Sequence, residues 1–458
     1  MIHLALFKGR KQMKEQQKKE VCLENIYKLD GRVPVAKAIP FGLQHILAMF
    51  VANLTPIILI AAASGVSEKQ QALLLQNAMF MAGIATLIQL YPLGRVGARL
   101  PIVMGVSFTF VTLLSYIGTE YGYATVVGSV IVGGILEGAL GLLAKYWRKI
   151  ITPLVAGIVV TTIGYSLLSV GVRSFGGGYT EDFGSAKNLL IGTVTLVACL
   201  LFNIVAKSFW KQLSVLFGLA VGYILSLALG VVDLSGVFDG GMIAIPRILP
   251  VTPEFNLNAI IAVFIIFMVS AAETIGDTSA VVATGLGREV TEKEISGSLA
   301  CDGFLSSVTG LFGCPPITSF SQNVGLVAMT KVVNRFTIMM GALCMILAGF
   351  FPPIANFFSS LPESVLGGCT IMMFGTIMVS GVQMLARAGF SQRNVIITAI
   401  SLAIGIGFTT ASEADIWRIF PQIVRDIFGG NCVAIVFVVS ILLSILLPQN
   451  MEVEKLGQ

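Results

Sequence analysis

The chain has 458 residues, of which 55% are apolar and only 12% are charged, with a formal net charge of +5. A soluble domain normally carries about twice that share of charged residues, so the composition excludes an ordinary water-soluble protein and indicates a polytopic membrane protein. Two histidines and seven scattered cysteines, without CxxC or Cys/His spacing, argue against zinc, haem or other metal and cofactor chemistry and against disulfides.

In chain order, residues 1–38 form a basic, Lys-rich tail that lacks the apolar core of a signal peptide. Apolar runs separated by short loops follow and predict an all-α fold with fourteen membrane spans. Their expected centres lie near residues 50, 81, 110, 133, 161, 197, 221, 268, 304, 322, 346, 374, 401 and 439. A hydrophilic linker, 231–256, separates a first group of seven spans (39–230) from a second (257–447), and residues 448–458 form a short tail.

The distribution of basic residues predicts the orientation. With the amino terminus inside, most of the 29 Lys and Arg residues fall on the cytoplasmic side, as the positive-inside rule requires. Both tails are then cytoplasmic, the linker is extracellular, and the protein lies in the plasma or inner membrane. Because seven is odd, the second group crosses the membrane in the opposite direction to the first, which indicates an inverted repeat. The similar segments "PIVMGVSFTF" and "PITSFSQNVG" occupy the third span of each group.

A few ionisable residues fall within the predicted spans, where each needs a partner, a cavity or a proton. Glu273 and Asp277 are four residues apart, so a helix places both carboxylates on one face among small residues. They form either a substrate or proton site or a polar pair between helices. Asp302 and His45, the latter preceded by Gln44, are candidates to support these acids, although each also fits a packing role. For Glu137, in a Gly-rich span, we favour a structural role.

The tenth span is interrupted by polar residues. Cys314-Pro315-Pro316 precedes it, and Gln322, Asn323 and Gly325 lie within it. Such a break must line a cavity if its backbone groups are to find partners. The Gln322 amide can both donate and accept hydrogen bonds, Glu273 can accept from two N–H groups, and Phe108 can stack on a ring. These groups suit a flat, oxo-substituted heterocycle, while a neutral amino acid or a sugar remains an alternative.

At these residues the sequence resembles the nucleobase–ascorbate transporter (nucleobase:cation symporter) family, whose signature is Q/E/P-N-x-G-x4-T-R/K/G. The segment from Gln322 to Lys331 matches every fixed position. The Gln44-His45 pair, "GVSFTF" in the third span and "ETIGD" in the eighth match further landmarks, and the resemblance covers about residues 39–447.

The resemblance implies a fold of two inverted seven-span repeats. Spans 1–4 and 8–11 would form a substrate-carrying core, and spans 5–7 and 12–14 a gate that also makes a homodimer. Spans 3 and 10 would each contain a short strand. The core would move against the gate like an elevator, with import coupled to protons.

The resemblance also implies residue roles. Substrate binding would involve Glu273, Gln322, Phe108, Ser321, Asn323 and Ser107. Proton coupling and support of the site would involve Asp277, Asp302, His45 and Gln44.

Gln322 and Asp277 resemble the residues of xanthine and uric acid members, whereas uracil members carry Glu and His there. Ser107, where some xanthine-selective relatives have Asn, is compatible with a wider pocket. We therefore expect a proton symporter for xanthine, uric acid or both. The alternatives are a uracil or broader nucleobase permease, driven by protons or sodium, and a receptor or scaffold without transport. An enzyme is not expected, because no catalytic cluster is visible.

Overall fold

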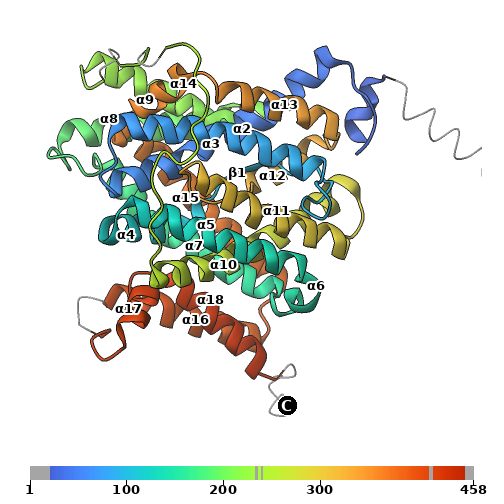
Figure 1. The fold of residues 1–458 in the computed structure, drawn as a ribbon, viewed down its shortest axis with the longest axis vertical. Helices are drawn as coiled ribbons and strands as arrows, with labels where there is room; N and C mark the ends of the chain where they lie inside the picture. The colour runs from blue at the N-terminus through green and yellow to red at the C-terminus, as the bar shows by residue number, and fades with distance from the viewer. Residues whose placement is uncertain (1–20, 233–235, 239–240, 412–415, 449–458) are drawn as a thin grey trace, which may run out of the picture.

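The computed structural model describes residues 21–232, 236–238, 241–411 and 416–448 (Figure 1). Residues 1–20 and 449–458 of the predicted tails, and residues 233–235 and 239–240 of the predicted linker, lie outside the described residues.

The first half of the chain is helical apart from one short strand. Its elements are η1 (Leu23–Tyr27), α2 (Val35–Ala63), α3 (Glu68–Leu90), β1 (Met104–Val106), η2 (Phe108–Phe110), α4 (Val111–Tyr121), α5 (Tyr123–Leu142), α6 (Ala144–Trp147), η3 (Arg148–Ile150), α7 (Pro153–Phe175), α8 (Ala186–Val205), η4 (Ser208–Leu213) and α9 (Ser214–Ala228).

The second half begins after the linker and follows a similar order. Its elements are α10 (Leu257–Val281), η5 (Val282–Leu286), α11 (Glu292–Leu311), β2 (Ile317–Ser319), α12 (Ser321–Thr330), α13 (Arg335–Ala348), α14 (Pro352–Ser359), α15 (Glu363–Ala388), α16 (Gln392–Thr410), α17 (Gln422–Phe428) and α18 (Cys432–Leu446). The described residues of 231–256 form no helix or strand.

Polar side chains set the starts of several long helices. Thr152 accepts a hydrogen bond from the backbone N–H of Val155 before α7, and Asn256 accepts from two N–H groups at the start of α10. At α11, Thr291 and Glu294 form a reciprocal capping box. These caps satisfy N–H groups that the first helical turn leaves without partners.

Among the described residues, nine helices are long and apolar enough to cross a membrane, or ten if α13 and α14, bent by 79°, form one span. Each of the fourteen expected centres lies on a helical segment, but several of those segments are short. The α12 helix has 10 residues and so extends about 15 Å, about half of the ~30 Å hydrocarbon layer. The chain is therefore a multi-pass membrane protein, and the count of fourteen spans stays a prediction.

The short strand β1 lies near the centre of the molecule (Figure 1), where it meets β2. β1 and β2 pair antiparallel, with Gly105 opposite Thr318. Side chains satisfy strand N–H groups that the pairing leaves over: Asn53 Oδ1 accepts from Val106 at 2.8 Å, and Ser306 Oγ accepts from Ile317 at 3.0 Å. These side-chain acceptors are needed because the membrane core holds no water to bind the strand N–H groups. The strands directly precede η2–α4 and α12, so these helices begin near the centre of the protein.

Helices of the two halves pack against each other in matched pairs. α5 packs on α11, α3 packs on α13, and α7 packs on α15. Glycines permit the close approach: a methyl group on Gly134 would lie 2.6 Å from the carbonyl oxygen of Gly303. Helices α16 and α18, with α17, form one end of the molecule, and α13 and α14 lie at the other (Figure 1).

The segment before α2 is attached to the start of α13. The Asn334 side-chain nitrogen lies 2.9, 3.1 and 3.0 Å from the carbonyl oxygens of Asn25, Lys28 and Gly31. The buried guanidinium of Arg335 donates to the Leu90 carbonyl at 2.7 Å and pairs with the Asp30 carboxylate. These contacts order residues that the sequence analysis placed in the amino-terminal tail.

Candidate functional site

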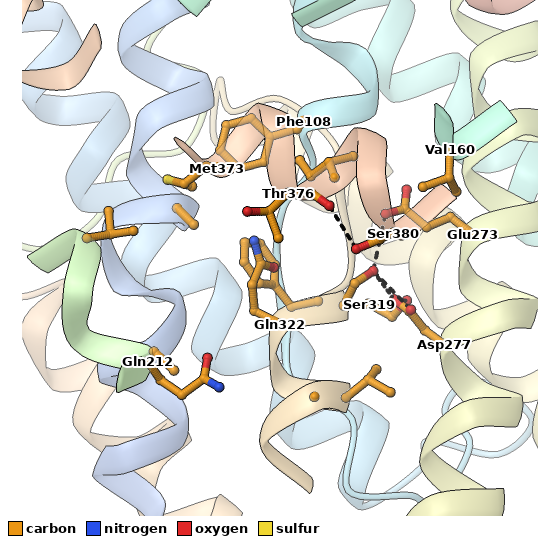
Figure 2. A pocket seen from close by; sticks show the side chains of 18 of the residues that line it. Phe108, Val160, Gln212, Glu273, Asp277, Ser319, Gln322, Met373, Thr376 and Ser380 are labelled. Carbon is orange, nitrogen blue, oxygen red and sulfur yellow. Dashed lines mark hydrogen bonds between the residues drawn. The ribbon is translucent and has the colours of Figure 1, made fainter. Parts of the chain in front are cut away.

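A cavity of about 530 Å³ lies where β2, η2, α10 and α12 face α7 and α15. Six of the predicted site residues line it: Ser107, Phe108, Glu273, Asp277, Ser321 and Gln322. Figure 2 shows the Gln322 side chain near the middle of the view, with Glu273 and Asp277 on one side and Gln212 on the other. A cavity of this size is typical of a small-molecule site.

Glu273 and Asp277 project from one face of α10 and share a hydroxyl partner. Ser321 Oγ lies 3.4 Å from Glu273 Oε1 and 2.9 Å from both Asp277 oxygens. Thr109 Oγ1 donates to Glu273 Oε2 at 2.8 Å. Each carboxylate is thus held by hydroxyl groups, and among the described residues neither forms an ion pair.

Asp302 lies behind the cavity wall, fully buried on α11. Thr274 Oγ1 donates to Asp302 Oδ2, and Ser319 Oγ lies 3.4 Å from Thr274 Oγ1 and 2.9 Å from Asp277 Oδ2. A hydroxyl carries one proton and donates to one acceptor at a time. Hydroxyl groups therefore connect Asp302 to the two cavity acids.

Gln322 and Phe108 offer different surfaces to the cavity. No hydrogen bond to the Gln322 amide is found within the described part of the chain, so both of its polar ends are open to a ligand. The Phe108 ring contacts Phe374 edge to face, with centroids 5.3 Å apart. Ser107, beside it, accepts a hydrogen bond from the Thr109 N–H at 3.2 Å and so fixes the start of η2.

Asn323 and His45 do not line the cavity, but they join two of its walls. Asn323 Nδ2 donates to the His45 carbonyl at 2.8 Å and lies 3.3 Å from His45 Nδ1. This pair ties α12 to α2, and both side chains are buried. Gln44 points elsewhere: it does not line the cavity, and it has no hydrogen bond to the described residues.

Glu137, to which the sequence analysis gave a structural role, is buried on α5 next to α11. Neither of its carboxyl oxygens has a hydrogen-bond partner among the described residues. The cavity lining does not include it.

Sequence reasoning missed several residues of the site. Thr109 and Ser319 hold the acids, while Gln212, Thr376 and Ser380 line the cavity from η4 and α15. The first two lie within the matched segments "GVSFTF" and "PITSFSQNVG", which was a usable signal. The other three had none, because they lie in ordinary amphipathic or apolar sequence.

Chemically, the cavity offers carboxylates, hydroxyls, an amide and an aromatic ring. No group of three or more His, Cys, Asp or Glu side chains that could hold a metal ion occurs among the residues that the structure describes. The arrangement suits reversible binding of a small planar molecule with N–H and C=O groups.

Residues 36–414 match the model of the Permease family named Xan_ur_permease, which spans most of the chain. The chain belongs to this family. Its membership confirms the resemblance inferred from the sequence, and it points to a transporter rather than an enzyme. The prediction that the protein is a transmembrane permease is likewise confirmed.

Curated relatives of this permease align along almost its whole length. The protein named "Putative purine permease CPE0397", from Clostridium perfringens, is 33% identical over 97% of this chain and 98% of its own. Xanthine permease XanQ of Escherichia coli K12 is 31% identical over 94% of this chain and 95% of its own.

Among solved structures, the permease is similar in fold to the transmembrane domain of the cyanobacterial bicarbonate transporter BicA. The TM-score is 0.57 at 15% identity, and the match covers 90% of this chain and 97% of that one. At that identity the likeness concerns the fold alone.

Proposed function

We propose that this permease is a secondary active transporter that imports an oxidised purine base, xanthine, uric acid or both, by proton symport. The observation that carries the proposal is one cavity lined by the Glu273 carboxylate, the open amide of Gln322 and the Phe108 ring. Xanthine presents three ring N–H donors and two carbonyl acceptors on a flat ring, so these three groups complement it. The names of the relatives support the same class of substrate.

In the proposed complex, Glu273 accepts hydrogen bonds from ring N–H groups and Gln322 binds the opposite edge. Phe108 packs against the base, and Ser107 and the Ser321 backbone contribute beside it. Asn323 holds α12 in position through its contact with α2. Thr109 and Ser319, which the sequence reasoning did not include, orient the two acids.

The proposed coupling ion is a proton carried by the acids. Asp302 is linked to Asp277 in the cavity wall through Thr274 and Ser319, which offers a proton a route of hydroxyl groups. His45 and Gln44 are assigned a supporting role, His45 through its contact with Asn323. Sodium coupling is the alternative.

For the whole chain we propose fourteen spans in two inverted repeats, 39–230 and 257–447, joined by the linker 231–256. The matched packing of α5 on α11 and of α3 on α13 supports the inverted repeat. An operation that interchanges the two repeats converts the α5–α11 pair into the α13–α3 pair. The core would comprise spans 1–4 and 8–11. The gate would comprise spans 5–7 and 12–14, form a homodimer and let the core slide like an elevator. Cytoplasmic termini follow from the charge distribution.

Uptake of radiolabelled xanthine, with unlabelled uric acid, hypoxanthine, guanine and uracil as competitors, tests the proposal. We expect saturable uptake that uric acid inhibits and uracil does not. Strong inhibition by uracil with none by uric acid would favour a uracil permease. No uptake of any of these bases would leave a receptor or scaffold as the better explanation.

A further inference from the structure

A second, smaller cavity of about 190 Å³ lies among α2, α4, α7 and the start of α15. It is below the ~300 Å³ at which ligand pockets usually begin. None of the predicted site residues lines it.

The second cavity shares a carboxylate, hydroxyl groups and an aromatic side chain with the first. Glu363 brings a carboxylate, and Ser174 Oγ donates to its Oε2 at 3.3 Å. The guanidinium carbon of Arg173 lies 4.9 Å from the ring centroid of Tyr179. Ser115 adds a hydroxyl that is buried and has no hydrogen-bond partner among the described residues. A flat base could therefore meet the Glu363 carboxylate as an acceptor for its N–H groups, and the Arg173 guanidinium and the Ser115 hydroxyl as donors for its carbonyls.

The same elements line both cavities at different heights. On α7, Ile163 lines the main cavity and Arg173 the second. These residues are ten apart, which is about 15 Å along a helix. On α15, Thr376 lines the main cavity and Glu363 the second. The two cavities therefore follow one another along the boundary between α2, α7 and α15.

Two contacts close the space between the cavities. One is the edge-to-face pair of Phe108 and Phe374, from η2 and α15. The other joins Thr112 Oγ1 of α4 to Ser166 Oγ of α7, at 3.5 Å. A substrate that moves between the cavities must separate these side chains.

We propose that the second cavity is a transit subsite, in which Glu363 and Arg173 hold the same oxidised purine before it passes the Phe108–Phe374 pair. The proposal rests on the proposed function. In the proposed orientation this subsite faces the outside, since Arg173 lies on that side, while Lys211 and Arg387 of the main cavity lie on the cytoplasmic side.

The first test is the kinetics of xanthine uptake by Glu363→Gln in intact cells. Loss of the carboxylate weakens capture from outside, so we expect KM to rise at least about threefold at equal protein in the membrane. Glu181→Gln, which removes an acid from the exposed loop near the cavity without touching its lining, should keep the KM of the parent. An unchanged KM in Glu363→Gln overturns the proposal.

The second test does not depend on the folding of that variant. Ser169→Cys places a thiol in the second cavity, and Ser380→Cys places one in the main cavity. With a membrane-impermeant maleimide added to intact cells, we expect labelling of Ser169→Cys above the parent, whose seven cysteines set the background, and little labelling of Ser380→Cys. Xanthine should slow the labelling of Ser169→Cys.

Protection must arise in the second cavity itself and not from binding in the main one. We therefore expect xanthine to protect Ser169→Cys also when Glu273→Gln is present. If protection disappears in that double variant, or if Ser169→Cys is not labelled from outside, the subsite is refuted. Failure of the proposed function is a different result: the parent would then not take up xanthine at all.

Discussion

One hydroxyl proton, on Ser321, lies between two carboxylates. Because Ser321 reaches both Glu273 and Asp277, only one of them can accept its proton at a given moment. The other keeps its second hydroxyl partner, Thr109 for Glu273 or Ser319 for Asp277, and has oxygen lone pairs left for a ligand or a proton. Binding of a ring N–H by Glu273 would release Ser321 to Asp277, so substrate and proton can influence each other through one side chain.

Replacement of Glu273 by Gln should abolish most of the uptake. Hydrogen bonds to a charged group contribute about 1.5–3 kcal/mol, so their loss weakens xanthine binding roughly tenfold to a hundredfold. The measurement is xanthine uptake at constant membrane expression, with exposed Glu68→Gln as control. Uptake of Glu273→Gln near the parent's rate would contradict the role proposed for this carboxylate.

Replacement of Gln322 by Glu should change which base is preferred. The carboxylate keeps the acceptor but loses the amide donor that faces a ring carbonyl. We expect the inhibition constant for xanthine to rise relative to that for uracil by about tenfold, equivalent to about 1.4 kcal/mol. The competition panel measures this ratio. The same ratio in parent and variant would mean that Gln322 does not touch the base.

At the scale of elements, the crossing of α5 and α11 depends on the absence of side chains. A methyl group on Gly303 would lie 2.6 Å from the Cα of Gly138 and 2.7 Å from the carbonyl carbon of Glu137. Backbone atoms in two packed helices cannot move away as a flexible side chain can. The crossing also encloses Asp302 and Glu137, so any separation of the helices would disturb these acids.

Gly303→Ala should therefore destabilise the protein. Overpacking of this kind costs about 1–3 kcal/mol, and we expect a lower melting temperature in detergent than for the parent. Gly407→Ala is the matched control, since Gly407 also lies inside a helix and a methyl group there would meet no atom within 4 Å. Equal melting temperatures of the two variants would show that the crossing can relax.

Some elements could be predicted from the sequence and others could not. The i, i+4 spacing of Glu273 and Asp277 and the polar break at Gln322 were visible locally, and these residues line one cavity. The hydrogen bond from Thr109 to Glu273 joins residues 164 positions apart, which no local pattern reveals. The bend between α13 and α14 was also missed, because Pro352 continues an apolar run that reads as one span.

At the scale of the whole molecule, the buried acids bear on which ion gradient drives the proposed uptake. A proton neutralises a carboxylate by binding to one of its oxygens, whereas a sodium ion needs several oxygen ligands around it. The route through Ser319 and Thr274 favours this choice. Accordingly, a protonophore should abolish accumulation of xanthine above its external concentration, both in sodium buffer and in potassium buffer. Accumulation that survives the protonophore and requires sodium would replace the proton with sodium.

The attachment of the leading segment to α13 has a practical consequence for anyone who re-engineers this protein. The Asn334 amide and the Arg335 guanidinium find acceptors on residues 25–31, so those residues are part of the packed fold at the start of α13 rather than a free tail. Fluorescent tags and purification handles belong upstream of Cys22. A shortened version that starts at α2 would leave the buried Asn334 amide and the Arg335 guanidinium without these acceptors.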